Sequence, residues 1–252
     1  ADGRVLFAVP WLGKLILGTT DTPRPDRPLE PQPFESELDF ILGEAGRYLA
    51  RAPQRADVRS CWVGLRPLAR PSGEGAGEGT GGISREHHIE RRASGLVSVT
   101  GGKWTTYRAM AEEVLALCMR TGLLPHQPAG RTRDWPLVGA GSGASAVQAA
   151  SLRQAQGLAR YGSEAAEVAR LPGADRKLAP DLSEAMVRFA ARFEHARTVE
   201  DVLARRVRLL FLDARAALQA AEAVAQVLQQ ETGVNPQLEA FRALAAGYCL
   251  SP

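Results

Sequence analysis

The sequence lacks the features that would place it in a special class of protein. No apolar run reaches the roughly 18 residues that a membrane-spanning helix needs. The three cysteines lie far apart and are odd in number, which argues against a disulfide framework or a zinc site. Reduced thiols and a cytoplasmic setting are therefore expected, with no metal.

The charge balance also excludes one class of partner. The formal net charge is only +3, and no basic stripe interleaved with aromatic side chains is present, so nucleic-acid binding is not expected. Hydrophobic residues make up 45% of the chain and charged residues 23%, as in ordinary globular proteins. A length of 252 residues allows one large domain or two ordinary ones.

The first half of the chain mixes strand and helix patterns. Apolar β-rich runs separated by turn residues predict two hairpins, and a capping serine followed by an apolar face predicts a helix. The expected elements are a hairpin at 4–10 and 14–20, a helix starting at Ser36 and reaching 49, a strand at 58–68, and a hairpin at 87–92 and 96–100. A stretch with five prolines, residues 21–33, must be loop.

The second half has a different composition. Gly and Pro are frequent over residues 125–143, and the chain beyond is rich in alanine with helical periodicity. The sequence therefore predicts an α+β fold: a partial antiparallel sheet with helices over residues 1–124, a linker at 125–143 and an all-α domain over 144–252.

The most informative segment is Gly101-Gly102-Lys103-Trp104-Thr105-Thr106-Tyr107-Arg108. It follows an apolar strand and leads into a predicted helix, so backbone N–H groups and a lysine converge where an anion can bind. The segment is not a Walker loop, because the residues between its glycines and Lys-Thr are missing. On physical grounds alone, a glycine turn before a capped surface helix is slightly favoured.

Other polar residues are ambiguous. Arg66 lies among apolar neighbours, where a guanidinium needs an ion pair or a cleft; the two explanations weigh equally. Arg85 alone is best explained as an exposed loop charge. His87 and His88 are adjacent on a strand and point to opposite faces, so they do not readily share a metal and are expected to be structural.

Several segments, in order, resemble the flavin-dependent glycerol-3-phosphate dehydrogenases, which are membrane-associated respiratory enzymes. The matching blocks are Phe7 to Trp11, Gly18 to Thr22, Gly64 to Leu68, Ser84 to His88, Gly101 to Arg108 and Thr198 to Arg206. The order and spacing of these blocks make the resemblance specific, and it covers nearly the whole chain.

The resemblance implies a function and a set of site residues. The family oxidises sn-glycerol 3-phosphate to dihydroxyacetone phosphate, with FAD as hydride acceptor and a quinone as electron sink. It implies that Arg66, Arg85 and Lys103 bind substrate, and that the cofactor is bound by Gly101, Gly102, Lys103, Thr105 and Thr106. The catalytic base is not identified by the sequence.

The resemblance has further implications for the chain as a whole. The sequence begins without Met and without the family's dinucleotide-binding unit, so it is expected to be a C-terminal portion that is inactive alone. Peripheral attachment to the inner face of the cytoplasmic membrane and a homodimer are compatible with the family. The alternatives are a related FAD-dependent oxidase of an amino acid or glycerophosphate, and a non-catalytic helical module for dimerisation or membrane contact.

Overall fold

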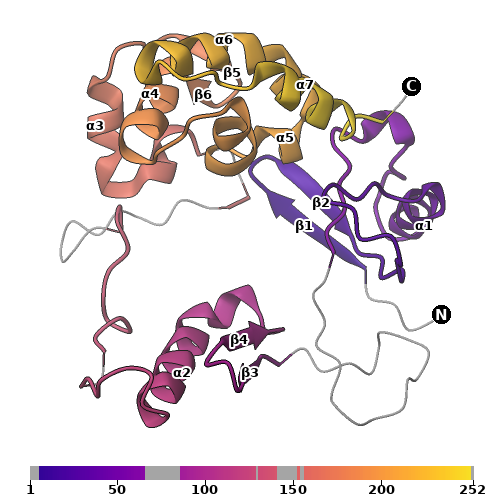
Figure 1. Cartoon of the computed structure of the whole chain (residues 1–252). Coiled ribbons are helices and arrows are strands. Elements are labelled where there is room, and N and C mark those ends of the chain that lie inside the picture. The colour runs from indigo at the N-terminus through magenta and orange to yellow at the C-terminus, as the bar shows by residue number, and fades with distance from the viewer. Residues whose placement is uncertain (1–5, 66–85, 129, 141–151, 154–155, 251–252) are drawn as a thin grey trace. The chain divides into compact units, whose positions relative to one another are not determined.

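The computed structural model describes residues 6–65, 86–128, 130–140, 152–153 and 156–250. The chain forms two compact units (Figure 1). The larger unit comprises Ala1–Thr20, Leu29–Val63 and Val138–Pro252, and the smaller one comprises Asp21–Pro28 and Gly64–Leu137. In this grouping the first hairpin and helix belong to the same unit as the C-terminal helices.

The C-terminal part of the larger unit is helical. Short helices and one small hairpin surround the long helix α6. In chain order the elements are η4 (Gly157–Glu164), α3 (Ala165–Arg170), β5 (Lys177–Ala179), β6 (Leu182–Ser183), α4 (Glu184–Phe193), η5 (Asp201–Arg206), α5 (Leu209–Leu212), α6 (Ala214–Thr232) and α7 (Leu238–Ala246). The expected helical character of this region is confirmed, with the addition of the β5–β6 hairpin.

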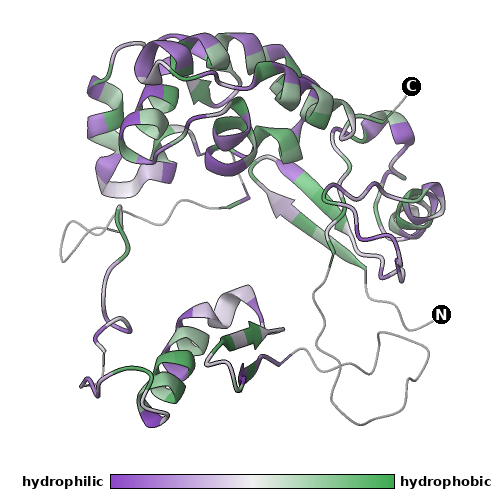
Figure 2. Ribbon diagram, viewed as in Figure 1, coloured by the Kyte–Doolittle hydropathy of each residue, from purple (hydrophilic) through white to green (hydrophobic). Residues whose placement is uncertain are grey.

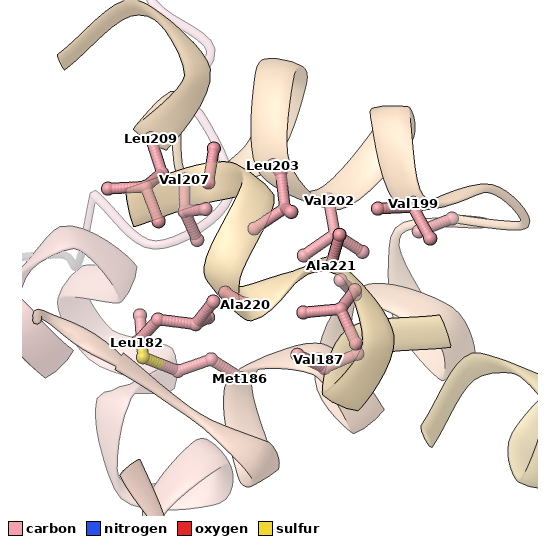
Figure 3. Packing of buried hydrophobic residues seen from close by; sticks show 14 of the residues in the cluster. Leu182, Met186, Val187, Val199, Val202, Leu203, Val207, Leu209, Ala220 and Ala221 are labelled. Atoms are coloured by element: carbon pink, nitrogen blue, oxygen red, sulfur yellow. The ribbon is translucent and has the colours of Figure 1, made fainter. Parts of the chain in front are cut away.

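The hydrophobic core of the larger unit lies around α6. Figure 3 shows Val187, Val202 and Leu203 converging on Ala220 and Ala221. Five alanines of α6 are at most 5% exposed, so neighbouring helices can approach closely and bury larger side chains against it; they are Ala214, Ala217, Ala220, Ala221 and Ala225. Hydrophobic and hydrophilic stretches alternate along these helices, as expected for elements with one buried face (Figure 2).

Two acidic side chains tie the helices together beside this core. Glu184, only 6% exposed, accepts hydrogen bonds from Arg176 and Arg188. Glu231 of α6 accepts from Arg188 and Arg192 of α4. The shared Arg188 makes this a connected network across α4 and α6, so each nearly buried carboxylate has a charged partner.

The N-terminal part of the larger unit contains the first predicted hairpin. Strands β1 (Phe7–Trp11) and β2 (Lys14–Gly18) pair antiparallel, with Val9 opposite Ile16. Leu12 and Gly13 both have positive φ, 49° and 81°, which is the backbone that a two-residue hairpin turn requires. The hairpin expected from the sequence is therefore confirmed over its described residues.

Helix α1 (Glu35–Gly46) follows the proline-rich loop. The predicted helix is present, but the expected cap at Ser36 is wrong, because Ser36 already lies in the first turn. Phe34 holds the N-cap position, and its N–H donates to the Glu37 carboxylate at 3.0 Å. The Glu37 side chain in the first turn therefore stabilises the N-terminus of α1, which is the capping role that the sequence predicted for Ser36.

The strand expected at 58–68 is not formed by its described residues, which end at Leu65. Their hydrogen bonds go to the ends of helices instead. Cys61 N–H donates to the carbonyl of Tyr248 at 2.9 Å, and the carbonyl of Arg59 accepts from Ala214 N–H at 3.1 Å. The apolar pattern is therefore satisfied by packing on helices, which periodicity alone cannot distinguish from strand pairing.

The smaller unit contains the second predicted hairpin and one helix. Strands β3 (His88–Arg91) and β4 (Val97–Thr100) pair antiparallel. The turn after β4 leads into the one-turn helix η2 (Trp104–Thr106) and then α2 (Tyr107–Arg120). Together with the helical C-terminal region, these elements confirm the predicted α+β class. The proposed sequence boundaries at 124 and 144 stay a prediction.

Candidate functional site

The candidate site is the turn that joins β4 to α2 in the smaller unit. Gly101 and Gly102 follow the strand with φ of 72° and 85°, a region that glycine enters without steric cost. Lys103 returns to extended backbone and holds the N-cap position of η2. The strand, turn and helix start predicted from the sequence are therefore confirmed.

The two glycines are required by the packing of the protein on itself. A Cβ atom at Gly101 would lie 2.6 Å from the carbonyl oxygen of Glu86. A Cβ atom at Gly102 would lie 2.6 Å from Cε of Met110 and 3.0 Å from Cβ of His87. Glycine is thus needed here whether or not a ligand approaches, so the glycine pair alone does not identify a binding site.

The backbone N–H groups of the turn point to anion binding more directly. Within the described part of the chain, the N–H groups of Gly102 to Thr105 have no backbone acceptor. Thr106 donates both its N–H and its hydroxyl to the carbonyl of Lys103, each at 3.0 Å. The Thr106 side chain therefore does not cap α2, although a threonine before a helix often does. Its two hydrogen bonds instead tighten the turn that carries the N–H groups of Gly102 to Thr105.

Lys103 adds a full charge beside these donors, and its side chain is exposed. Next to it lies an aromatic pair that the sequence reasoning did not use. The ring of Trp104, 84% exposed, stacks on Tyr107 with centroids 5.3 Å apart and planes 24° apart. The sequence could have predicted this pair, because a Trp and a Tyr three residues apart at the start of a helix lie on the same face.

His87 holds the turn against α2. Its Nε2 lies 2.7 Å from Oε2 of Glu113 on α2, while its Cβ borders Gly102. His88 begins strand β3 and is exposed. The structural role expected for the histidine pair fits this arrangement, and the residues that the structure describes contain no group of His, Cys, Asp and Glu able to hold a metal.

Two of the predicted substrate-binding residues cannot be placed. Arg66 and Arg85 lie outside the described residues. Lys103, Gly101, Gly102, Thr105 and Thr106 all lie on the one described turn. The structure thus brings the predicted cofactor-binding residues together and leaves the two arginines as predictions.

The chemistry of the turn suits a group that presents hydrogen-bond acceptors or gains negative charge, such as the carbonyl edge of the flavin of FAD. Consecutive N–H donors and an ammonium group stabilise negative charge that develops on a bound group, and they need no rearrangement to do so. An apolar or cationic ligand would leave these donors unsatisfied. The donor set therefore fits the cofactor that the sequence predicts.

The larger unit contains two cavities that the sequence reasoning did not predict. One has a volume of about 340 Å³ and is lined mainly by apolar side chains of β2, of α1 and of residues 57–62. The second has a volume of about 210 Å³ and is lined mainly by charged and polar residues of the helical region. Such cavities depend on contacts between segments that are distant in the sequence, so no local sequence pattern predicts them.

Both halves of the chain match known protein families. Residues 1–117 match the model described as FAD dependent oxidoreductase, and residues 130–238 match the C-terminal domain of alpha-glycerophosphate oxidase. The chain is 35% identical to the mitochondrial glycerol-3-phosphate dehydrogenase of Schizosaccharomyces pombe over 92% of its own length and 43% of that protein. It is 36% identical to the human mitochondrial glycerol-3-phosphate dehydrogenase over 92% of its length and 34% of that protein.

A solved structure shares the fold. The glycerol-3-phosphate dehydrogenase from Bacillus halodurans, determined in complex with FAD, superimposes with a TM-score of 0.70 at 23% identity. The match covers 99% of this chain and 52% of that protein, so the chain spans about half the length of the solved relative and less of the curated ones. Residues 1–117 therefore match the FAD dependent oxidoreductases, residues 130–238 match the C-terminal domain of alpha-glycerophosphate oxidase, and the curated relatives that span both segments are glycerol-3-phosphate dehydrogenases.

Proposed function

We propose that the chain is part of an enzyme that oxidises sn-glycerol 3-phosphate to dihydroxyacetone phosphate with FAD as hydride acceptor and a quinone as electron sink. The observation that carries the proposal is the turn at Gly102–Thr105, where N–H groups without a backbone acceptor in the described chain adjoin the exposed Lys103. The names of the relatives support the substrate, and the family description supports FAD.

The residues of the turn would hold the cofactor and stabilise its charge. Bound FAD supplies the capacity to accept a hydride, which no side chain of the protein has. The N–H groups of Gly102 to Thr105 would donate to its carbonyl edge, and Lys103 would offset the negative charge that reduction adds. Thr106 would keep this part of the backbone fixed through its two hydrogen bonds to the Lys103 carbonyl.

Substrate recognition would rest on cationic side chains. Under the proposal, Arg66 and Arg85 join Lys103 in binding the phosphate, because guanidinium groups suit phosphate bidentately and an ammonium adds a point charge. An amino-acid substrate carries a carboxylate and a positive charge instead, and three cations would disfavour its ammonium group. The proposal therefore favours a phosphate ester over an amino acid.

The resemblance to the family implies peripheral attachment to a membrane, and we include it in the proposal. None of the helices in the described residues is both long and apolar enough to cross a bilayer. Delivery of electrons to a quinone would then require contact with the membrane surface, and a homodimer is compatible with this arrangement.

The test uses the native gene product with FAD bound. Under anaerobic conditions, addition of sn-glycerol 3-phosphate should bleach the visible absorbance of the flavin, and a quinone should restore it. Oxidised flavin after addition of substrate would contradict the substrate assignment, and bleaching by an amino acid instead would favour the related oxidases.

Variants of the turn sharpen the test. Lys103→Met should weaken FAD binding and slow flavin reduction, because it removes the charge beside the N–H donors. Arg120→Met removes an exposed charge at the other end of α2 and serves as the matched control, with no expected effect. Arg66→Lys keeps the charge but loses the planar fork, so we expect a raised KM for sn-glycerol 3-phosphate; an unchanged KM would refute the role of Arg66.

A further inference from the structure

The apolar cavity of about 340 Å³ lies entirely within the larger unit. Strand β2 and helix α1, which lie close together in Figure 1, form two of its walls, and residues 57–62 with the end of α5 form much of the rest. The turn at Gly101–Thr106 contributes no residue to this lining. The walls carry aliphatic and aromatic side chains, among them Leu17, Leu42, Trp62 and Phe211.

The polar side chains Ser60 and Asp57 in the walls are already hydrogen-bonded. Ser60 donates its hydroxyl to the carbonyl of Leu210 at 2.7 Å. The Asp57 carboxylate accepts from Gln54 N–H and from Arg51, each at 2.9 Å. These side chains therefore need no ligand to satisfy them, and the remaining wall surface favours a ligand with an apolar body.

Lys14 and Arg59 give the cavity a positive charge. Both line it and are exposed, and neither has an ion-pair partner in the part of the chain that the structure describes. Among the described lining residues, Asp57 is the one carboxylate, and it pairs with Arg51. The lining therefore carries three cations and one carboxylate, and two of the cations have no ion pair.

The acidic side chains of α1 are engaged outside the cavity. Glu35 and Asp39 pair with Arg55, and Glu37 accepts from Phe34 N–H at 3.0 Å. None of these three carboxylates lines the cavity. The charge that a ligand in the cavity would meet directly is thus positive, which favours an anionic head group.

We infer that the apolar cavity binds the anion of a single-chain carboxylic acid, that is, a free medium-chain fatty acid. Its alkyl chain would lie against Leu17, Leu42 and Phe211, and its carboxylate would bind Lys14 and Arg59. At about 30 Å³ for each water-sized group, the volume holds about eleven such groups, which suits a chain of about ten carbons. A lipid with two long chains would exceed this volume.

Calorimetry on the native gene product with FAD bound tests the apolar half of the inference. The ligands are straight-chain carboxylates from hexanoate to decanoate, below the concentrations at which they form micelles. Each added methylene should strengthen binding by about threefold to fourfold, because burying a methylene is worth about 0.8 kcal/mol. One equivalent of decanoate should bind, and affinity that does not rise with chain length would overturn the inference.

The charge of the head group is tested at constant chain length. Decyltrimethylammonium has the same ten-carbon chain and a positive head group, which Lys14 and Arg59 should repel. We expect it to bind about tenfold more weakly than decanoate, because two favourable ion pairs become two like-charge contacts. Equal affinities would show unspecific apolar binding and overturn the role of the cations.

Lys14→Gln and Arg59→Gln test the two cations separately. Each should weaken decanoate binding by about threefold to fivefold, the value of an exposed ion pair, and the double variant by about tenfold. Arg47→Gln is the matched control, because Arg47 is exposed and pairs with Glu44 outside the cavity. Full affinity in the double variant would overturn the inference.

Two cysteines of the chain report where the ligand binds. Cys61 lines the cavity, whereas Cys118 lies on α2 in the smaller unit, and both thiols are free. Alkylation with N-ethylmaleimide, followed by peptide mass spectrometry, gives a rate for each thiol. Burial raises the pKa of the Cys61 thiol, so the reaction needs a mildly alkaline buffer.

Decanoate at ten times its Kd should slow the alkylation of Cys61 by about tenfold, because only about one-tenth of the protein stays unoccupied. The rate at Cys118 should not change. Protection of Cys118 instead of Cys61, or an unchanged rate at Cys61, would overturn the site. This readout does not depend on flavin reduction, so the inference and the proposed function fail independently.

Discussion

Gly101 and Gly95 offer a matched pair for measuring how tightly the turn is packed. The two residues flank strand β4 and both have positive φ, 72° and 88°. A Cβ atom at Gly95 would meet nothing within 4 Å, whereas at Gly101 it would lie 2.6 Å from the backbone oxygen of Glu86. Substitution by alanine therefore imposes the same conformational strain at both positions and a steric clash at only one.

The expected magnitudes follow from these two terms. A left-handed backbone costs a residue with a Cβ atom about 1–2 kcal/mol, which is the whole effect expected for Gly95→Ala. Gly101→Ala must in addition displace the backbone at Glu86, since a carbonyl cannot rotate away as a side chain can. Overpacking of this kind adds about 1–3 kcal/mol, so Gly101→Ala should destabilise by about 2–5 kcal/mol.

Native-state hydrogen exchange of the β3 and β4 amides is the assay, because it reports the free energy of opening of the smaller unit by itself. Gly101→Ala should accelerate exchange of these amides more than Gly95→Ala does. Amides of α6 in the larger unit provide the internal control. Equal destabilisation by the two substitutions would refute the close packing of the turn against Glu86.

Two further predictions concern the larger unit. Arg188 and Arg192 hold the pKa values of Glu184 and Glu231 below the ordinary 4.5. The two ionised carboxylates therefore stabilise the folded state above about pH 4.5, and this contribution to the free energy of unfolding is lost as pH falls further. Urea unfolding as a function of pH should show this loss, and Glu231→Gln should remove part of it at a cost of about 3 kcal/mol at neutral pH. Asp213 caps α6 by accepting from Ala216 N–H at 3.0 Å, so Asp213→Ala should lower the free energy of unfolding by about 0.5–2 kcal/mol, whereas the exposed Asp175→Ala should not.

The sequence predicted those parts of the fold that are specified locally. Both hairpins and helix α2 follow from alternating apolar residues, turn residues and helical spacing, and each is present. The stretch at 58–65 shows the limit of such reasoning, because its backbone forms hydrogen bonds to Tyr248 and Ala214 instead of to another strand. Hydrogen-bond partners that are so distant in the sequence cannot be predicted from a local pattern.

The candidate site shows the same limit. The turn at Gly101–Thr106 was predicted because strand, glycines and helix start are contiguous, so local rules apply. The polar cavity of about 210 Å³ was not predicted, because Arg160, Glu194 and Arg208 come from separate elements, and each alone is an ordinary charged residue in a helical region. The adjacent Arg205 and Arg206 illustrate this, since Arg205 pairs with Glu200 while Arg206 lines the cavity.

The packing around the turn bears on how a ligand would be bound there. Contacts from Glu86, His87 and Met110 fix the two glycines, and the His87–Glu113 contact fixes the strand against α2. The donors of Gly102 to Thr105 are therefore oriented by the protein before any ligand arrives. Donors fixed in advance stabilise developing charge without reorganising during the reaction. Under the proposed function, the glycine pair would serve binding indirectly, since it allows the strand and the helix to pack closely enough to hold the N–H groups still.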